Sequence, residues 1–301
     1  MALSGYFDES GVHAGAHATL IAGFVGSADA FDAAEAEWQF VLDDEGVHPN
    51  HFHYSKMVNS WKPFEWVDEP LRQRLFPRLA SVIEKAVPEL RLAAVSYAGK
   101  WEVPLTDDDR FNIEFPNPYS FCFQFMLESL DEWAGSELND TIVPVFARHQ
   151  EYSPPAMELW NAVMPTNSWS HLGPVGFDDP RSRQSLQMAD MVLYELYQAL
   201  RGPHVDWRTL PLLSKLWKDR ETLERATLFN HGHDKRTLQR MVARGPKQWV
   251  PGGLTKPIFD HQLAEMEEKP PPVVKGSFWR LAARFFRERL RLLWDLVRQR
   301  R

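Results

Sequence analysis

The segment that most limits the folds open to this chain runs over residues 183–200. Its apolar residues recur at helical spacing, and within 186–197 the only polar residues that are not aromatic are Gln187, Asp190 and Glu195. A helix that is apolar on nearly all sides is normally buried on most of them. The sequence therefore predicts a core helix over this segment.

The rest of the first 200 residues alternates β-compatible runs with helical ones. A strand over 2–8 and a second over 17–26, joined by a turn, predict a β-hairpin. Pro144 places the strand predicted over 141–146 at a sheet edge or a bulge. Strands that alternate with helices favour the α/β or α+β class. The other expected elements are a strand over 90–98 and helices over 31–42, 71–87, 117–133, 155–164 and 210–244.

Composition excludes several classes of protein. Of the 301 residues 44% are hydrophobic and 12 are Trp, which supplies a sizeable core and argues against a disordered or fibrous chain. Because Cys122 is the single cysteine, an intrachain disulfide and a thiolate metal cluster are excluded. Neither a secretory signal nor an uninterrupted apolar run of about 20 residues is visible, so we expect a soluble, cytoplasmic protein.

Charge is divided unevenly along the chain. Residues 277–301 contain eight arginines, no lysine and two acidic residues, a net charge of +6, so the remainder carries −13. An acidic body does not attract phosphates at long range, so a nucleic-acid role would need a local basic patch or bound cations.

Residues 277–301 place arginines and apolar residues on separate faces, which predicts a basic amphipathic helix. Such a helix could bind an anionic membrane surface, the acidic groove of a partner protein or nucleic-acid phosphates. It could also dock on the acidic body of its own chain. The Pro-rich linker over 268–276 favours an outward-reaching role.

Acidic residues at both ends of the first 200 residues are candidates for chemistry. Asp8 and Glu9 come at the end of the first predicted strand, where alternation turns successive side chains to opposite sides; an ordinary solvated turn is the alternative. Gln187 and Asp190 share one face of the core helix, and an ionised carboxylate there needs a charged partner or a metal. Arg183, one turn earlier, could be that partner.

Two pairs of histidines have metal-ligand spacing. His51 and His53 would face the same side of an extended segment and could hold Zn²⁺, although a structural zinc site needs about four ligands. An ordinary loop with one packed histidine is the alternative. His231 and His233 have the same spacing and weaker support.

Glu151 follows the strand predicted over 141–146 and could converge with Asp8 near a sheet edge. The sequence contains no glycine-rich phosphate loop, nucleophile elbow or zinc-protease helix, so the corresponding enzyme classes lose support.

Taken together, YFDESG near the N-terminus, HFHYSKM near residue 50 and SLQMADMVLYEL near residue 190 resemble the domain-of-unknown-function family 3800, which is regarded as RNase H-like. The likeness covers residues 3–200. The family's acidic pair falls on Asp8 and Glu9, its histidine on His53, and the glutamine and aspartate of its last helix on Gln187 and Asp190.

One position departs from the family's pattern. Members commonly carry an acidic residue directly after the aromatic residue of the fourth strand, where this chain has Ala147. Glu151 is the nearby acidic residue that could compensate. Without such compensation the metal site would lack a ligand.

The resemblance implies an RNase H-like mixed central sheet flanked by helices over 1–202. A helical or irregular extension over 203–267, the Pro-rich linker over 268–276 and the basic helix over 277–301 would follow.

It also implies a nuclease that hydrolyses phosphodiester bonds of DNA or RNA with Mg²⁺ or Mn²⁺, usually two ions about 3.5–4 Å apart. The expected metal ligands are Asp8, Glu151 and Asp190, with Glu9 as a ligand or a supporting group, His53 as a general acid/base or phosphate contact, and Gln187 orienting Asp190 or a water. One alternative is a non-catalytic effector that acts through its basic C-terminal helix; another is hydrolysis of a small phosphorylated or nucleotide substrate.

Overall fold

The computed structural model describes residues 3–13, 15–86, 89–98, 107, 115, 117–138, 140–163, 169–200, 207–217, 227–234 and 238–239. The predicted linker over 268–276 and the predicted basic helix over 277–301 lie outside these residues.

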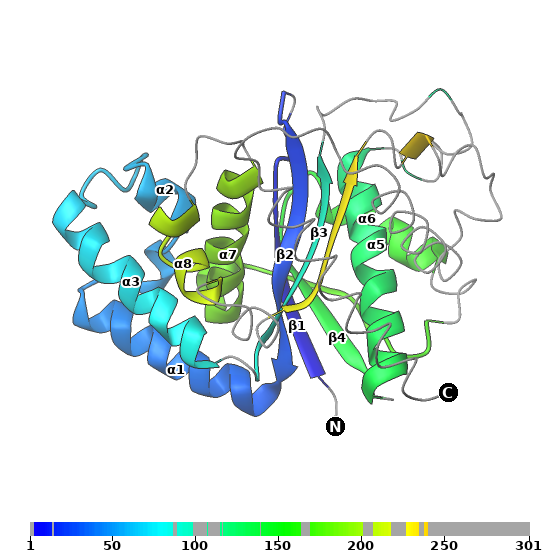
Figure 1. The fold of residues 1–301 in the computed structure, drawn as a ribbon, viewed down its shortest axis with the longest axis horizontal. Coiled ribbons are helices and arrows are strands. Elements are labelled where there is room, and N and C mark those ends of the chain that lie inside the picture. The colour runs from blue at the N-terminus through cyan, green and yellow to red at the C-terminus, as the bar shows by residue number, and fades with distance from the viewer. Residues whose placement is uncertain are drawn as a thin grey trace, which may run out of the picture.

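A mixed six-stranded sheet forms the middle of the molecule, in the order β5-β4-β1-β2-β3-β6 (Figure 1). β1 pairs antiparallel with β2 and parallel with β4, so the first strand lies inside the sheet. β2 and β3 are antiparallel, whereas β3–β6 and β4–β5 are parallel pairs. The strands are β1 (Leu3–Ser10), β2 (Ala18–Ser27), β3 (Arg91–Ala98), β4 (Ile142–Ala147), β5 (Gly176–Asp178) and β6 (Thr227–Asp234).

Helices cover both faces of the sheet, which makes the protein a layered α/β structure (Figure 1). One face packs against α1, α2, α3, α7 and α8, and the other against α5 and α6. The helices are α1 (Ala28–Asp44), α2 (Tyr54–Val58), α3 (Glu69–Ala86), α5 (Pro118–Trp133), α6 (Ser153–Val163), α7 (Gln184–Leu200) and α8 (Leu213–Leu216).

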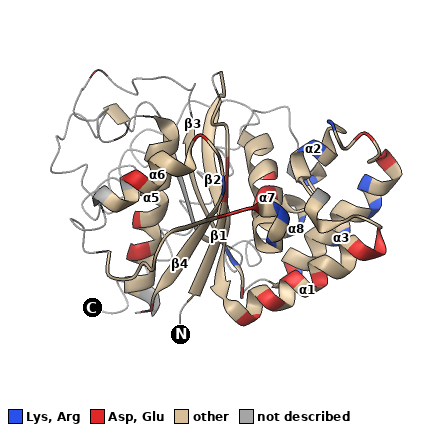
Figure 2. Cartoon of the chain, turned by 180° about the vertical axis from the view of Figure 1, so that it is seen from behind, with Lys and Arg blue, Asp and Glu red and all other residues tan. Residues whose placement is uncertain are grey.

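Alternation along the strands supplies both hydrophobic cores. Leu20 and Ala22 of β2 belong to the core on the α7 face, while Ile21 and Val25 belong to the core on the α5 face. A strand buried on both faces reads as a continuous apolar run, which is what β2 shows. The four inner strands carry three charged residues, Asp8, Glu9 and Arg91, whereas charges are frequent on α1 and α3 (Figure 2).

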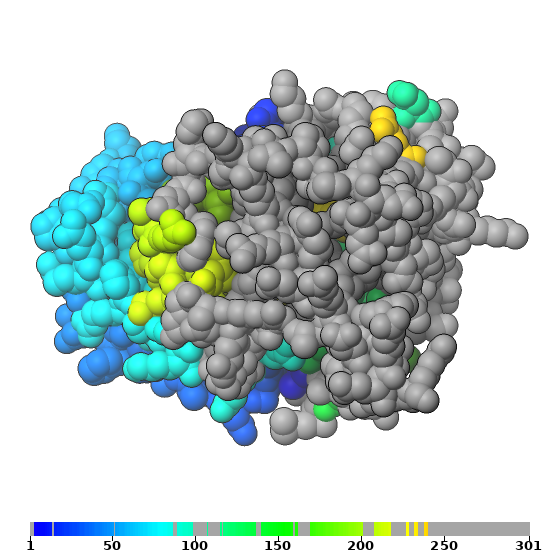
Figure 3. Space-filling model, in the orientation of Figure 1, coloured from blue at the N-terminus to red at the C-terminus, as the bar shows by residue number. Residues whose placement is uncertain are grey.

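The smaller helix α8 lies against α3 on the α7 side of the sheet. In the space-filling view its yellow-green atoms adjoin the cyan atoms of α3 (Figure 3). Lys215 of α8 and Glu84 of α3 form an ion pair at 3.1 Å. Within the part of the chain that the structure describes, no helix combines the length and the apolar character needed to cross a bilayer.

The β1–β2 hairpin and the core helix are confirmed. α7 begins at Gln184, one residue after the predicted start. The turn depends on Gly11, which has a φ of +73°, and a Cβ there would come within 1.8 Å of the Ala18 carbonyl oxygen. α5 also begins where predicted, because the Asn117 side chain accepts a hydrogen bond from the Ser120 N–H.

Three predictions about strands were wrong. β1 continues to Ser10, because its pairing with β2 extends to Ser10 opposite Leu20, so Asp8 and Glu9 lie within the strand. β4 is not an edge strand: β5 pairs with Val145–Ala147, which leaves Pro144, without an N–H to donate, outside that ladder. Residues 227–234, predicted as helical, form β6 beside β3, so the sheet draws on the chain beyond residue 202.

Candidate active site

Asp8 and Asp190 come together between β1 and α7. Asp8 pairs with Ala22, which packs on the α7 face of the sheet, and so its side chain points toward that layer. Asp190 is buried on α7, with its side chain 12% exposed. The carboxyl of Asp8 experiences the charges of Glu9, Asp190 and His53. His53 therefore contacts Asp190 on the side of the sheet toward which Asp8 also points, although the three residues are far apart in the sequence.

His53 is held by Asp190. Its Nδ1 lies 3.2 Å from Asp190 Oδ2, and the Tyr54 N–H donates to the same oxygen at 2.8 Å. Burial and the nearby Lys56 lower the pKa of His53, but the hydrogen bond to Asp190 and the negative charges outweigh them, so that this pKa is raised. The His53 side chain is 40% exposed. The imidazole is thus oriented at one nitrogen and remains accessible to a ligand.

The surroundings of Asp8 disfavour its ionised form. Burial, the Glu9 carboxylate and the Asp190 carboxylate together raise the pKa of Asp8 well above its usual value, and His53 offsets them only in part. A divalent cation beside Asp8 would reverse this effect, because positive charge favours the ionised carboxyl.

The donor set suits one kind of metal site. Among the described residues, no group of three or more His, Cys, Asp and Glu side chains is arranged to hold a metal ion. Asp8, His53 and Asp190 therefore do not form such a three-ligand group by themselves. Mg²⁺ is usually bound through one or two carboxylates plus substrate phosphates, and it retains several waters. Asp8 and Asp190 fit that description.

Gln187 has a different role from the one predicted. Its amide oxygen accepts a hydrogen bond from Trp38 Nε1 at 3.0 Å, and its amide nitrogen donates to the carbonyls of Pro49 and Pro180, also at 3.0 Å. Both amide hydrogens are therefore used on backbone carbonyls. Gln187 joins α7 to α1 and to the segment before His53, and it positions that segment rather than Asp190.

Glu195 and Tyr54 are the residues that sequence reasoning missed. Glu195 is fully buried on α7 and accepts hydrogen bonds from the Tyr54 hydroxyl and from the N–H groups of Leu212 and Leu213. Asp190 thus holds the Tyr54 backbone while Glu195 holds its side chain. The sequence offered one signal for Glu195: it is one of three polar, non-aromatic residues within 186–197 of the predicted core helix.

Arg183 is not the charged partner of Asp190. Its Nε lies 3.5 Å from Asp178 Oδ2, and its guanidinium carbon is 5.8 Å from the centre of the Tyr6 ring. The hydrogen-bond partners of Asp190 are instead the Tyr54 N–H and His53.

Glu9 lies on the opposite face of the sheet from Asp8, as strand alternation predicts. It pairs with Ile21 of the α5-side core, and its charge acts on Tyr119 of α5 and on Tyr152. Glu9 Oε2 is buried without a hydrogen-bond partner among the described residues. Burial raises the pKa of Glu9 to about 8. Burial therefore favours the protonated form of Glu9, whose side chain lies on the other face of the sheet from that of Asp8.

The raised pKa of Glu9 predicts a pH dependence of stability. Between pH 4.5 and 8 the folded chain keeps a proton that the unfolded chain has lost, so the free energy of unfolding falls by about 1.4 kcal/mol per pH unit. Glu9→Gln carries no titrating proton and should flatten this dependence by roughly 3 kcal/mol between pH 5 and 8. Urea denaturation at pH 5 and at pH 8 measures the free energy of unfolding of wild type and variant. If the free energy of unfolding changes equally with pH in wild type and in Glu9→Gln, the raised pKa of Glu9 is contradicted.

Ala147 is adjacent to an acidic residue, but not to Glu151. It is buried at the end of β4 and pairs with Asp178 of β5, whose side chain therefore stands on the same face of the sheet. Glu151 is exposed in the turn before α6, where its charge acts on Tyr152. The charges that act on the Asp8 carboxyl include those of Glu9, Asp190 and His53. The predicted convergence of Glu151 with Asp8 stays a prediction.

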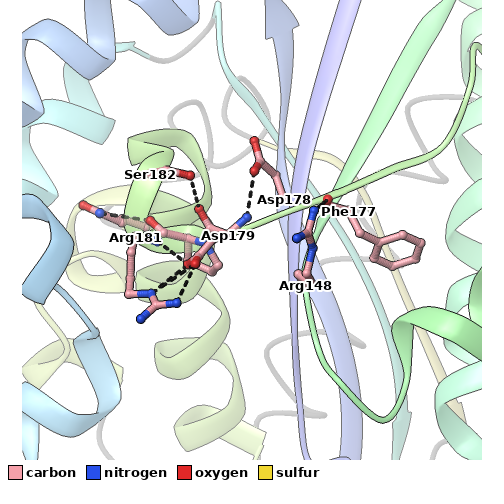
Figure 4. Close-up of polar contacts among 8 residues, drawn as sticks. Arg148, Phe177, Asp178, Asp179, Arg181 and Ser182 are labelled. Atoms are coloured by element: carbon pink, nitrogen blue, oxygen red, sulfur yellow. Dashed lines mark hydrogen bonds and ion pairs between the residues drawn. The ribbon is translucent and has the colours of Figure 1, made fainter.

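Short-range contacts fix the chain between β5 and α7. Arg148 Nη2 donates to the Phe177 carbonyl at 2.9 Å, and Arg181 pairs with Asp179 at 2.6 Å (Figure 4). The Asp178 carboxylate accepts a hydrogen bond from the Asp179 N–H at 2.8 Å. This segment presents the Pro180 carbonyl to Gln187 and so sets the start of α7.

The backbone and the described side chains test the two histidine pairs in part. His51 ends a short 3-10 helix (Pro49–His51), so it and His53 do not lie on an extended segment. His233 is buried on β6 and packs against Phe121 and Phe125, with ring centres 5.1 and 4.8 Å apart. It is therefore part of the core on the α5 face.

Comparison with protein-family models, with curated proteins and with solved structures found no match to this chain.

Proposed function

We propose that this chain is an RNase H-like, divalent-metal-dependent nuclease that hydrolyses phosphodiester bonds of DNA or RNA at Asp8, Asp190 and His53. The observation that carries the proposal is the contact of His53 with Asp190 on the face of the sheet toward which Asp8 points, from a loop, a helix and a strand that are distant in the sequence. An inner first strand beside a late core helix agrees with the arrangement that the family resemblance implies.

The residues divide into two roles. Asp8 and Asp190 would hold Mg²⁺ or Mn²⁺ together with the substrate phosphate, and such an ion supplies positive charge that acidifies water and stabilises a leaving oxygen. His53, oriented through Nδ1 by Asp190, can exchange a proton at its other ring nitrogen. Its raised pKa favours the protonated form, which suits a general acid for the leaving oxygen.

The acidic character of the chain is compatible with this role. A carboxylate pair alone would repel a phosphodiester, but a bound divalent cation inverts the local charge. Binding would then depend on the metal ion rather than on long-range attraction by the protein.

The decisive experiment is an activity screen of the full-length wild type. Labelled single-stranded and duplex oligonucleotides of DNA and RNA are incubated with Mg²⁺ or Mn²⁺, beside a panel of mononucleotides. We expect cleavage of an oligonucleotide that EDTA stops and added metal restores. Turnover of mononucleotides alone would favour the small-substrate alternative. Cleavage that persists in EDTA, or no cleavage under any condition, would overturn the proposal.

A further inference from the structure

The loop between α2 and α3 exposes two tryptophans in the segment that follows His53 and α2. Trp61 is 59% exposed and Trp66 is 49% exposed. Among the described residues one other large hydrophobic side chain is comparably exposed, Phe40 of α1 at 64%. Exposed tryptophan side chains forgo the free energy gained by burying apolar surface. Two of them in one short loop therefore mark a candidate binding surface.

The loop is rigid rather than loosely attached. Ser60 Oγ donates to the Val67 carbonyl at 3.0 Å and closes the two ends of the loop. Arg72 of α3 donates to Ser60 Oγ at 2.6 Å and to the Val58 carbonyl at 3.2 Å. Phe64 and Val67, between and beside the tryptophans, are buried in the core. The tryptophans are therefore held outward by a framework that is already ordered.

The loop is connected directly to the residues that form the site. α2 starts immediately after His53, and the Trp61 N–H donates to the Lys56 carbonyl at 2.9 Å, which places the loop one short helix away from His53. At the start of the loop, Asn59 Nδ2 donates to the hydroxyl of Tyr194, one turn beyond Asp190 on α7. The loop is therefore tied to the His53 segment, which contacts Asp190, and to α7, the helix that carries Asp190.

The charges near the loop are balanced between basic and acidic side chains. Lys62 lies between the tryptophans and is exposed, and Lys56 is close enough to His53 to lower its pKa. Glu65, Asp68 and Glu69 are exposed acids. Glu69 pairs with Arg72 at 2.9 Å, and Asp68 accepts the Leu71 N–H at 2.8 Å.

We infer that Trp61 and Trp66 form a stacking platform for unpaired bases of a single-stranded nucleic acid whose phosphates reach the Asp8–Asp190 site. Base stacking on aromatic side chains is tolerant of sequence, and it requires bases that are not stacked in a duplex. The inference rests on the proposed function and narrows its substrate to single strands.

The test measures binding and cleavage separately. Affinity for a short fluorescein-labelled oligothymidylate and for the corresponding duplex is measured by anisotropy. The variants are Trp61→Ala, Trp66→Ala and the matched control Phe40→Ala, all in the Asp190→Asn background, in which cleavage is expected to be about a hundredfold slower or more. We expect each tryptophan variant to bind the single strand about tenfold more weakly. Phe40→Ala should bind as its parent does, and all three should keep the circular dichroism spectrum because the side chains are exposed.

The outcomes separate this inference from the proposed function. Weaker single-strand binding by the tryptophan variants supports the platform even if wild type cleaves nothing, in which case the proposed function alone fails. Cleavage by wild type together with unchanged affinity in both tryptophan variants overturns the platform alone. Equal loss of affinity for single strand and duplex would also overturn it, because stacking requires unpaired bases.

Discussion

Replacing Asp190 by asparagine is expected to reduce metal-dependent cleavage by about a hundredfold to ten-thousandfold while leaving the fold intact. The asparagine oxygen can still accept the Tyr54 N–H, so the backbone before α2 keeps its anchor. What is lost is the negative charge that attracts a cation and that raises the pKa of His53. Calorimetric titration of Mn²⁺ should show weaker binding than in wild type, and Asp8→Asn should give the same result.

A second measurement on the same variant does not depend on turnover. Because the hydrogen bond to Asp190 and its charge raise the pKa of His53, that pKa should fall in Asp190→Asn. The protonated fraction at neutral pH then falls as well. Imidazole proton signals followed by NMR as a function of pH report the shift, with His53→Gln identifying the resonance.

The matched control is Asp32→Asn, the same chemical change on the exposed side of α1. It should leave Mn²⁺ binding, the pKa of His53 and cleavage unchanged. Cleavage retained in Asp190→Asn, with the pKa of His53 unmoved, would show that the contact between them has no functional role.

Glu195→Ala is expected to lower the free energy of unfolding by about 4 kcal/mol, the largest stability effect in this region. The substitution leaves the Tyr54 hydroxyl and the N–H groups of Leu212 and Leu213 as buried donors without an acceptor. Each unsatisfied buried donor costs roughly 1–3 kcal/mol, and the cavity adds to the loss. Urea denaturation monitored by circular dichroism measures the change.

Glu195→Gln separates the lost hydrogen bonds from the lost charge. Glutamine keeps the shape and one acceptor oxygen, so it should lose less stability than alanine. Burial raises the pKa of Glu195 to about 7, so in wild type this residue makes stability fall as pH rises from 4.5 to 7. The Glu195→Gln variant should lack this contribution to the pH dependence of stability. A Glu195→Ala protein within about 1 kcal/mol of wild type would contradict the role assigned to this residue.

Periodicity was enough to predict the β1–β2 hairpin, the core helix and a fold of the α/β or α+β class. These features depend on local patterns: alternation in the strands, helical spacing in α7, and the Asn117 cap of α5. Asp190 was also identifiable as a residue that needs a partner, because an ionised carboxylate within an apolar helix is costly without one. Asp8 was a candidate from its place at a strand end, and the role of His53 came from the family resemblance.

Only the tertiary structure decided what each polar group contacts. The three hydrogen bonds of Gln187 reach residues 149, 138 and 7 positions away in the sequence. The placement of Glu9 behind the sheet and of β6 beside β3 likewise depends on strand pairing. Local patterns set which residues are buried, since burial follows from periodicity. A hydrogen bond or ion pair requires two groups within about 3 Å, and for residues far apart in sequence that distance is set by the packing of whole layers.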